Sequence, residues 1–240
     1  MINVLINGCE GKMGKMLFKQ IEASDMFNYI GGIDKGYDIT KIKTLPDVII
    51  DFSTPIATLS ILEFAVANNV PVVIATTGFS ENENILIEEY SKVIPIFKSA
   101  NMSYETNLMI SLVSKIAKEL HNSDIEIVEI HHNQKIDSPS GTALMLADSI
   151  NNALDNSMHY EFDRHSKKVK RDKSEIGIHS LRGGTEVGKH SVFFFGENES
   201  LEISHTVTSR AVFANGALKA AEFIIGKPAG LYNMNDLINA

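Results

Sequence analysis

The sequence predicts an α/β protein that combines a doubly wound parallel sheet with a second, α+β domain containing a mixed or antiparallel sheet. Short apolar runs alternate with helical patterns over roughly the first hundred residues, which is typical of parallel sheets. A glycine-rich turn joins the first run to the first helix. After residue 175, three strand-like runs follow one another without a helix between them. We therefore expect one domain from residues 1–102, completed by 211–240, and another from 103–210.

Composition limits the classes of protein that the chain can belong to. Its 240 residues are 44% hydrophobic, so each domain can bury an ordinary core. The formal net charge of −8 argues against broad nucleic-acid binding. The single Cys9 excludes an intramolecular disulfide and fits a reducing compartment. No apolar run reaches membrane-spanning length and the N-terminus lacks a signal-peptide pattern, so we expect a cytoplasmic protein without a membrane partner.

The glycine-rich turn has the features of a dinucleotide-binding site. A short apolar strand at residues 4–6 is followed by Gly8, Gly11 and Gly14 in a G-x-x-G-x-x-G pattern, and then by a helical pattern. Glycines at such a turn let the backbone approach a pyrophosphate at the helix N-terminus, as in Rossmann-like sheets. The alternative is a glycine turn with a purely structural role.

A second feature of the dinucleotide-binding pattern, an acidic residue, follows the next strand, which is expected at residues 30–33. Asp34 is placed to accept hydrogen bonds from a ribose, whereas the neighbouring Lys35 can meet a 2′-phosphate. The pair leaves both NADH and NADPH open as cofactors. The alternative is that both residues are ordinary charges at a strand end.

Further strands are expected at residues 48–52, 70–75 and 93–97, with helices between them; Ser80 and Glu83 form a predicted capping box. The carboxyl ends of parallel strands meet at one edge, where ligands bind. The residues predicted to bind the cofactor are Gly8, Cys9, Glu10, Gly11, Lys12, Met13, Gly14, Asp34, Lys35, Phe52, Ser53, Ala75, Thr76, Thr77, Ser99, Ala100, Asn101 and Met102.

The most informative stretch runs from Glu129 to Ala143, with the sequence EIHHNQKIDSPSGTA. A strand at 125–130 precedes it and a helix to about Leu154 follows, so Pro139 is expected in the first helical turn. Backbone N–H groups at that helix start attract a carboxylate or phosphate. Two histidines and a lysine lie beside it, which indicates proton donation next to an anion-binding pocket.

Each part of this stretch also has a structural interpretation. The pair His131 and His132 can be a polar strand edge, and Lys135 can be a solvated loop charge. A zinc site is disfavoured, because the chain has one cysteine and no second histidine cluster at ligand spacing. We therefore predict no metal.

The remaining patterns complete the second domain. A helix is expected at 104–120 with Leu108, Leu112 and Ile116 on its packed face, and a polar loop at 155–175. Strands follow at 176–181, 187–195 and 201–209, the last two forming a hairpin. A helix at 213–225, closed by Gly226 as C-cap, is expected to rejoin the first domain.

These motifs together resemble the dihydrodipicolinate reductase family along essentially the whole chain. The matching segments are the glycine turn at 8–14, ATTG at 75–78, SANMS at 99–103, the segment Glu129–Ala143, and FANGA at 213–217. The central segment is highly specific. It departs from the family at Ser138, where alanine is usual, and we expect this change at a helix entry to be harmless.

The resemblance implies a reductase of diaminopimelate and lysine biosynthesis that reduces a cyclic, unsaturated dicarboxylate with NADH or NADPH. It also implies a homotetramer and assigns roles in the site. His131 is the implied proton donor, and Lys135 stabilises charge and binds substrate. The implied substrate-binding residues are His132, Lys135, Ser140, Gly141 and Thr142. We also expect the two domains to close on ligand.

Two other functions remain open from the sequence. One is another two-domain dehydrogenase of a small acid. The other is a non-catalytic NAD(P)-sensing protein on the same fold, which the intact His-His-x-x-Lys pattern argues against.

Overall fold

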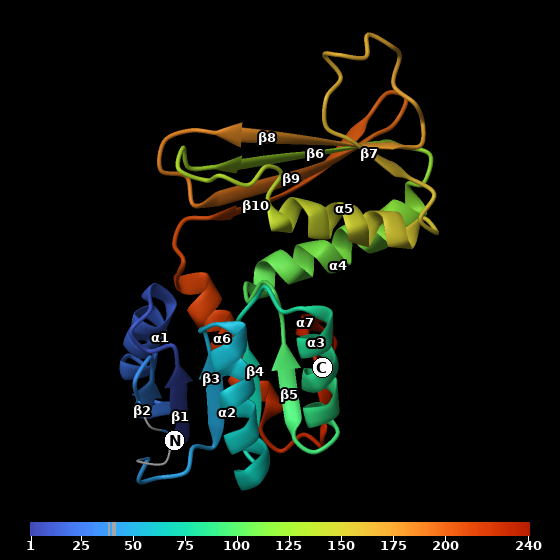
Figure 1. The fold of residues 1–240 in the computed structure, drawn as a ribbon. Helices are drawn as coiled ribbons and strands as arrows, with labels where there is room; N and C mark the ends of the chain where they lie inside the picture. Colours follow the sequence, from blue (N-terminus) through green and yellow to red (C-terminus); the bar gives the residue numbers. More distant parts are fainter. Residues whose placement is uncertain (38, 40–41) are drawn as a thin grey trace. The chain divides into compact units, whose positions relative to one another are not determined.

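The computed structural model describes residues 1–37, 39 and 42–240. The chain divides into two compact units, which Figure 1 shows as a ribbon. The first unit contains residues 1–104 and 210–240, and the second contains residues 105–209. Each unit has its own sheet and its own core, and each is described by itself below.

The first unit is built on a six-stranded sheet with the order β11-β5-β4-β3-β1-β2, and every pairing in it is parallel. Its elements are β1 (Ile2–Asn7), α1 (Lys12–Glu22), β2 (Phe27–Ile33), β3 (Val48–Asp51), α2 (Pro55–Asn68), β4 (Val72–Ile74), α3 (Glu81–Ser91), β5 (Pro95–Lys98), α6 (Ala211–Ile224), β11 (Gly230–Tyr232) and α7 (Met234–Ile238). The predicted parallel sheet is confirmed.

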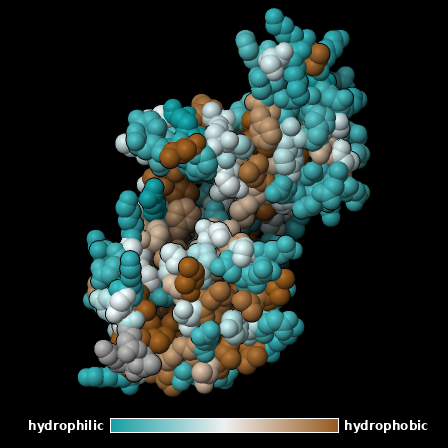
Figure 2. Space-filling model, viewed as in Figure 1, coloured by the Kyte–Doolittle hydropathy of each residue, from teal (hydrophilic) through white to brown (hydrophobic). Residues whose placement is uncertain are grey.

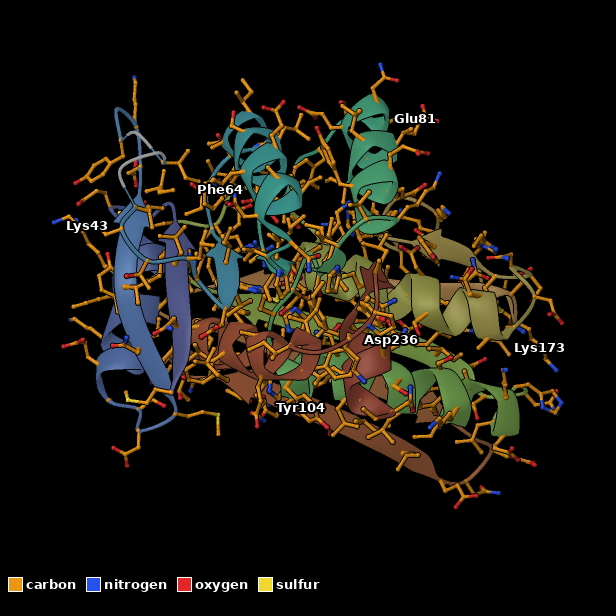
Figure 3. The ribbon with its side chains drawn as sticks, turned by 90° about the horizontal axis from the view of Figure 1, so that it is seen from below. Lys43, Phe64, Glu81, Tyr104, Lys173 and Asp236 are labelled. Atoms are coloured by element: carbon orange, nitrogen blue, oxygen red, sulfur yellow. The ribbon has the colours of Figure 1, made fainter. Side chains whose placement is uncertain are left out.

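Helices cover both faces of this sheet. On β1, the alternating side chains Val4 and Ile6 pack with α1 and α6, whereas Leu5 packs with α2 and α3. In the view of Figure 3, Phe64 on α2 and Glu81 on α3 mark two neighbouring helices on one side of the sheet. The unit is therefore doubly wound, and the order in which successive strands are added to the sheet reverses between β1 and β3.

The second unit is built on a five-stranded mixed sheet with the order β10-β9-β6-β8-β7. Its elements are α4 (Tyr104–Glu119), β6 (Asp124–His131), α5 (Gly141–Ala153), β7 (His159–Glu161), β8 (Glu175–Arg182), β9 (Gly188–Phe195) and β10 (Ser200–Val207). Strand β6 runs parallel to β8 and antiparallel to β9, which forms the predicted hairpin with β10. The prediction of a mixed sheet is confirmed.

Helices α4 and α5 pack against one face of this sheet, as Figure 1 shows. The packed face of α4 was predicted only in part. Ile116 packs against the core of this unit as predicted, but the fully buried residues are Met109, Val113 and Ala117, and Leu112 is 42% exposed. Both sets repeat every four residues, so periodicity alone cannot separate them; the smaller Ala and β-branched Val fit closer to the sheet.

Two helix ends also differ from the predictions. Pro139 lies before Ser140, which is the N-cap of α5, so the proline is outside the first helical turn. Helix α6 has Ile225 as its C-cap, and Gly226 follows with a φ of 76°. The capping box of Ser80 and Glu83 is confirmed.

The expected loop at 155–175 contains the short strand β7, which the sequence did not indicate. Beyond it, the chain makes a polar excursion that Figure 2 shows as a mostly hydrophilic surface. Arg164 and Arg171 attach the excursion to the sheet, because both donate to Glu126 Oε1, at 3.0 and 3.1 Å. The short elements β11 and α7 were likewise not predicted.

Candidate functional site

The first unit has a cleft of about 810 Å³ at the carboxyl ends of β1, β2 and β3. This is the point where the strand order switches direction, which is where doubly wound sheets bind ligands. Seven of the predicted cofactor residues line it: Gly8, Glu10, Gly11, Asp34, Lys35, Phe52 and Ser53.

Glycines shape the backbone at the start of α1. Gly8 has a φ of 84°, and a Cβ added there would lie 2.3 Å from the Phe52 carbonyl oxygen. A Cβ on Gly14 would lie 2.2 Å from the Gly8 carbonyl oxygen. The N-cap Gly11 brings no side chain, and the first turn of α1 contains no acidic residue. The helix N-terminus therefore offers N–H groups without a competing carboxylate, and this geometry fits a pyrophosphate.

Asp34 holds an ionised carboxylate at the rim of this cleft. Its oxygens accept hydrogen bonds from the backbone N–H of Lys35 at 2.8 Å and of Glu10 at 2.9 Å. These two backbone hydrogen bonds lower the pKa of the Asp34 carboxyl below its ordinary value. The Lys35 side chain beside it is exposed. The pair presents one acceptor for ribose hydroxyls and one cation for a phosphate.

The remaining predicted cofactor residues do not line this cleft. They are Cys9, Lys12, Met13, Gly14, Ala75, Thr76, Thr77, Ser99, Ala100, Asn101 and Met102. Met13 and Cys9 pack against the core beside α1 and α6, and Met102 is buried in that core. The hydroxyl of Thr76 accepts a hydrogen bond from the backbone N–H of Ser53 at 2.8 Å, so Thr76 supports a residue that lines the cleft.

A buried polar network beneath the cleft was not predicted. Asp51 is 0% exposed and accepts hydrogen bonds from Asn7, Ser53 and Thr58 at 2.7, 2.5 and 2.6 Å. Burial raises the pKa of the Asp51 carboxyl, against the opposing effect of these hydrogen bonds. Asn7 and Ser53 line the cleft, so Asp51 fixes two of its polar side chains. The signal was visible as one acid in an otherwise apolar strand.

The second unit brings His131 and Glu129 together on the face of β6 that points toward its helices. The two residues are two positions apart, so they share one face of the strand. The distance from His131 Nδ1 to Glu129 Oε2 is 2.5 Å. Glu129 is 0% and His131 is 9% exposed. Burial lowers the pKa of His131, Glu129 raises it, and the balance lies below the ordinary value.

Arg182 at the end of β8 completes the ion pair. Its Nη1 and Nη2 donate to the two carboxylate oxygens of Glu129 at 2.8 and 2.7 Å. Burial disfavours the Glu129 carboxylate, but hydrogen bonds from Arg182, Ser180 and His131 outweigh it and lower the pKa of Glu129 to about 2. Such a two-pronged contact also fixes the orientation of the carboxylate.

The N-terminus of α5 begins next to this ion pair. The backbone N–H of Ser140 donates to Glu129 Oε1 at 3.1 Å, and the Ser140 hydroxyl accepts from the N–H of Ala143 at 3.2 Å. His190 Nε2 lies 3.0 Å from the same hydroxyl. Ser140 was predicted to bind substrate; its side chain is buried and serves the helix cap. Burial lowers the pKa of His190 to about 4.

The other predicted substrate residues lie on the loop and helix start that follow His131. Lys135 Nζ is 2.8 Å from Asp137 Oδ1, and the Lys135 side chain is 20% exposed. His132 and Thr142 are partly buried, and Gly141 is exposed at the first position of α5. The same short segment therefore carries a buried imidazole, an ammonium group and a helix N-terminus.

Sequence reasoning missed three residues of this cluster: Glu129, Arg182 and His190. In the sheet, His131 pairs in register with Arg182 on β8, and Glu129 pairs with His190 on β9. Only Glu129 had a local signal, since it stands two residues before His131 on an expected strand. Arg182 and His190 are brought next to His131 and Glu129 by the pairing register of the strands, which cannot be read from the sequence.

None of the helices within residues 1–37, 39 and 42–240 is long and apolar enough to cross a membrane. Within the same ranges, His, Cys, Asp and Glu side chains form no group of three or more that could hold a metal ion.

The doubly wound sheet, the glycine turn and the cleft at the switch point are the features of a dinucleotide-binding unit, which is joined here to a second, α+β unit. Comparison with known families gives the particular family. Residues 2–102 match the model described as dihydrodipicolinate reductase, N-terminus, and residues 106–238 match the model described as dihydrodipicolinate reductase, C-terminus. The chain belongs to the dihydrodipicolinate reductase family.

Individual relatives agree with this assignment. The chain is 50% identical to a 4-hydroxy-tetrahydrodipicolinate reductase of Caldanaerobacter subterraneus subsp. tengcongensis, with 99% of this chain and 98% of the relative covered. It is 45% identical to the enzyme of that name from Clostridium novyi, with 100% and 99% covered. A dipicolinate-bound dihydrodipicolinate reductase from Paenisporosarcina sp. TG-14 is 25% identical with a TM-score of 0.81, and 98% and 99% of the two chains are covered.

The chain accordingly catalyses the NADH- or NADPH-dependent reduction of 4-hydroxy-tetrahydrodipicolinate to tetrahydrodipicolinate with loss of water, in diaminopimelate and lysine biosynthesis.

Proposed function

We propose that the first unit binds the nicotinamide cofactor and that the second binds the dicarboxylate and protonates it. The main support for this proposal is that His131, Lys135 and the N-terminus of α5 lie within one segment of the second unit. Proton donor, cation and anion-binding backbone are the three groups that such a reduction requires.

The bound cofactor supplies a hydride to the conjugated C=C–C=N system of the substrate. The ring carbon adjacent to the C=N carbon then carries excess electron density and needs a proton. His131 donates that proton, because an imidazole titrates close to neutral pH. Lys135 stabilises the negative charge as it develops, and its ammonium also contacts a substrate carboxylate.

Backbone N–H groups at Gly141 and Thr142 bind one carboxylate of the substrate, and His132 contacts it from the preceding strand end. This arrangement is supported by the start of α5 at Gly141, because the N-terminus of a helix favours an anion through its backbone N–H groups and its dipole. Ser140 contributes indirectly, because its hydroxyl caps the helix. The dipicolinate-bound relative has the same class of ligand in its name.

In the first unit, the turn from Gly8 to Gly14 holds the pyrophosphate and Asp34 accepts hydrogen bonds from the adenosine ribose. Lys35 binds the 2′-phosphate of NADPH when that cofactor is used. The support is the geometry of the glycine turn and the paired position of carboxylate and ammonium at the rim of the cleft.

The protein is also proposed to be a cytoplasmic homotetramer assembled through the second sheet. No described helix of this unit covers the face of the sheet opposite to α4 and α5. That face carries apolar side chains, including Leu181 and Phe195, which are 47% and 42% exposed, and Phe195 stacks on Phe193 with ring centroids 5.7 Å apart. Light scattering of wild type and Phe195→Asp should give a tetramer and a smaller species; a wild-type monomer would contradict the assembly.

Steady-state kinetics with synthase-generated substrate and NADH tests the roles in the second unit. Thr142→Val should raise KM for the dicarboxylate with a smaller effect on kcat, because Thr142 contributes mainly to binding. Lys135→Ala should damage both parameters, because the ammonium binds the ground state and stabilises developing charge. Absence of turnover in the wild type, or wild-type constants for Lys135→Ala, would contradict the proposal.

A further inference from the structure

We propose that Glu129 is the positioning residue of the proton donor: it holds His131 with a proton on Nδ1, so that Nε2 is the atom that delivers the proton. This inference rests on the proposed function, in which His131 is the donor. Four contacts around the buried carboxylate of Glu129 support this role.

The contacts of Glu129 leave its carboxylate with acceptor roles only. Oε1 accepts hydrogen bonds from Arg182 Nη2 at 2.7 Å and from the Ser140 N–H at 3.1 Å. Oε2 accepts a hydrogen bond from Arg182 Nη1 at 2.8 Å and lies 2.5 Å from His131 Nδ1. A guanidinium cannot lose its proton in a protein, so Arg182 keeps Glu129 ionised. An ionised carboxylate cannot donate a hydrogen bond, and the shared proton therefore belongs to Nδ1 of His131.

Gly188 leaves space beside Nε2, the other ring nitrogen of His131. A Cβ added at Gly188 on β9 would lie 3.0 Å from His131 Nε2 and 3.4 Å from its Cδ2. His190, two residues further along β9, meets the His131 ring edge-on, with centroids 5.2 Å apart. The ring of His131 is thus held at Nδ1 and along one edge, while Gly188 keeps a side chain away from Nε2.

The proton transfer itself balances simply. After hydride addition, the electron-rich carbon of the substrate forms a bond to the proton on Nε2 of the imidazolium. The electron pair of the N–H bond stays on Nε2, and the product is a neutral imidazole with its proton on Nδ1. Water then returns a proton to Nε2. Glu129 remains a carboxylate throughout and stabilises the imidazolium before each transfer.

The charged groups that face His131 come from several elements. Glu129 lies on its own strand, Lys135 on the following loop, Arg182 on β8 and His190 on β9. Glu129 is the only anion among these four, and its hydrogen bond and charge both raise the pKa of His131. Replacement of Glu129 by a neutral group should therefore lower the pKa of His131. A general acid works below its pKa, so the loss of kcat at high pH should move to lower pH.

The test compares kcat against pH for Glu129→Gln, and Glu126→Gln is the matched control. Glu126 lies on the same strand and faces the other side of the sheet. It also meets a histidine, with His179 Nε2 at 2.7 Å, and two arginines. The two variants thus remove the same charge from similar surroundings. Circular dichroism and calorimetric NADH binding check that each variant folds and keeps its first unit intact.

We expect Glu129→Gln to lower kcat by about 10- to 100-fold at pH 8 and to move the high-pH loss of kcat down by about one pH unit, since a neighbouring opposite charge shifts a pKa by this order. Glu126→Gln should leave the position of that loss unchanged. A folded Glu129→Gln enzyme whose pH profile coincides with that of the wild type would overturn the proposal.

His131→Gln separates this inference from the function on which it rests. If His131→Gln loses kcat and Glu129→Gln keeps the wild-type profile, only the positioning role fails. If His131→Gln keeps kcat, the assignment of the proton donor itself fails. If Glu129→Gln does not fold, Arg182→Lys is the alternative variant for the same test, because lysine retains the charge but loses the two-pronged contact with Glu129. Its pH profile should shift in the same direction by less, and a wild-type profile for this variant would also overturn the proposal.

Discussion

The two candidate sites of this chain are built by opposite means. The cleft of the first unit is shaped by backbone: Gly8 and Gly14 bring main-chain atoms to distances that no Cβ could tolerate, and its charges stay at the rim. The cluster of the second unit is made of buried side chains, in which Glu129, Arg182 and His131 form one hydrogen-bonded group. A binding site for a preformed cofactor needs shape, whereas a site that moves a proton needs controlled charge.

This difference predicts different failures. A substitution in the backbone-shaped site should reduce cofactor affinity and leave the pH dependence of turnover intact. A substitution in the charge-based site should reduce turnover or change its pH dependence, with little effect on the cofactor. The predictions below test this division in order of decreasing effect.

The largest effect is expected for His131→Gln. Loss of a positioned general acid costs about 10²–10⁴-fold in rate, so kcat should fall by that order. NADH affinity, measured by calorimetry, should remain close to that of the wild type, because His131 belongs to the other unit. Near-normal kcat would mean that water or another group supplies the proton.

A smaller loss is expected for Gly14→Ala, and it should appear in a different measurement. The new Cβ would meet the Gly8 carbonyl oxygen at 2.2 Å, so the turn or the start of α1 must move. Strain of about 1–3 kcal/mol corresponds to roughly a 5- to 150-fold loss of NADH affinity. Gly183→Ala is the control, because no described heavy atom lies within 4 Å of its added Cβ. Unchanged NADH affinity in Gly14→Ala would contradict the claim that the cofactor cleft is shaped by close backbone contacts.

The buried, uncharged imidazole of His190 should also make the protein sensitive to acid. The pKa of His190 is lowered from 6.5 to about 4 by burial, so between these values the unfolded chain binds a proton that the folded chain does not. Stability therefore falls as the pH is lowered through this range, by about 1–2 kcal/mol at pH 5. Urea unfolding at pH 7 and pH 5 should show this loss in the wild type. The loss should shrink in His190→Gln and persist in His121→Gln; equal losses in all three would exclude His190 as its source.

The smallest effect is expected at the exposed rim of the cleft. Lys35→Ala should weaken NADPH binding by about five- to tenfold, the order of one exposed contact to a phosphate, and leave NADH binding nearly unchanged. Calorimetry with both cofactors measures the ratio. An equal loss for the two would show that Lys35 does not distinguish them.

The same contrast explains what could be predicted from the sequence. The glycine turn, Asp34 and the strand ends of the first unit were predicted from local spacing, because glycines and an acidic residue stand at characteristic intervals after the strands. His131, Lys135 and the start of α5 were also found locally, within one segment. The partners Arg182 and His190 were not, since they reach Glu129 and His131 through the register of three strands. The packed face of α4 was predicted only in part for a similar reason, because two neighbouring apolar stripes fit the same helical period and only contact with the sheet distinguishes them.

The most direct test of the charge-based site is ¹⁵N NMR of histidine-labelled protein, with the His131 resonances assigned by their absence in His131→Gln. The contact with an ionised Glu129 requires the neutral ring to carry its proton on Nδ1. We expect the chemical shifts of a protonated Nδ1 and an unprotonated Nε2 above the pKa of His131. A neutral ring with its proton on Nε2 would place the donated proton on the wrong nitrogen and contradict the account.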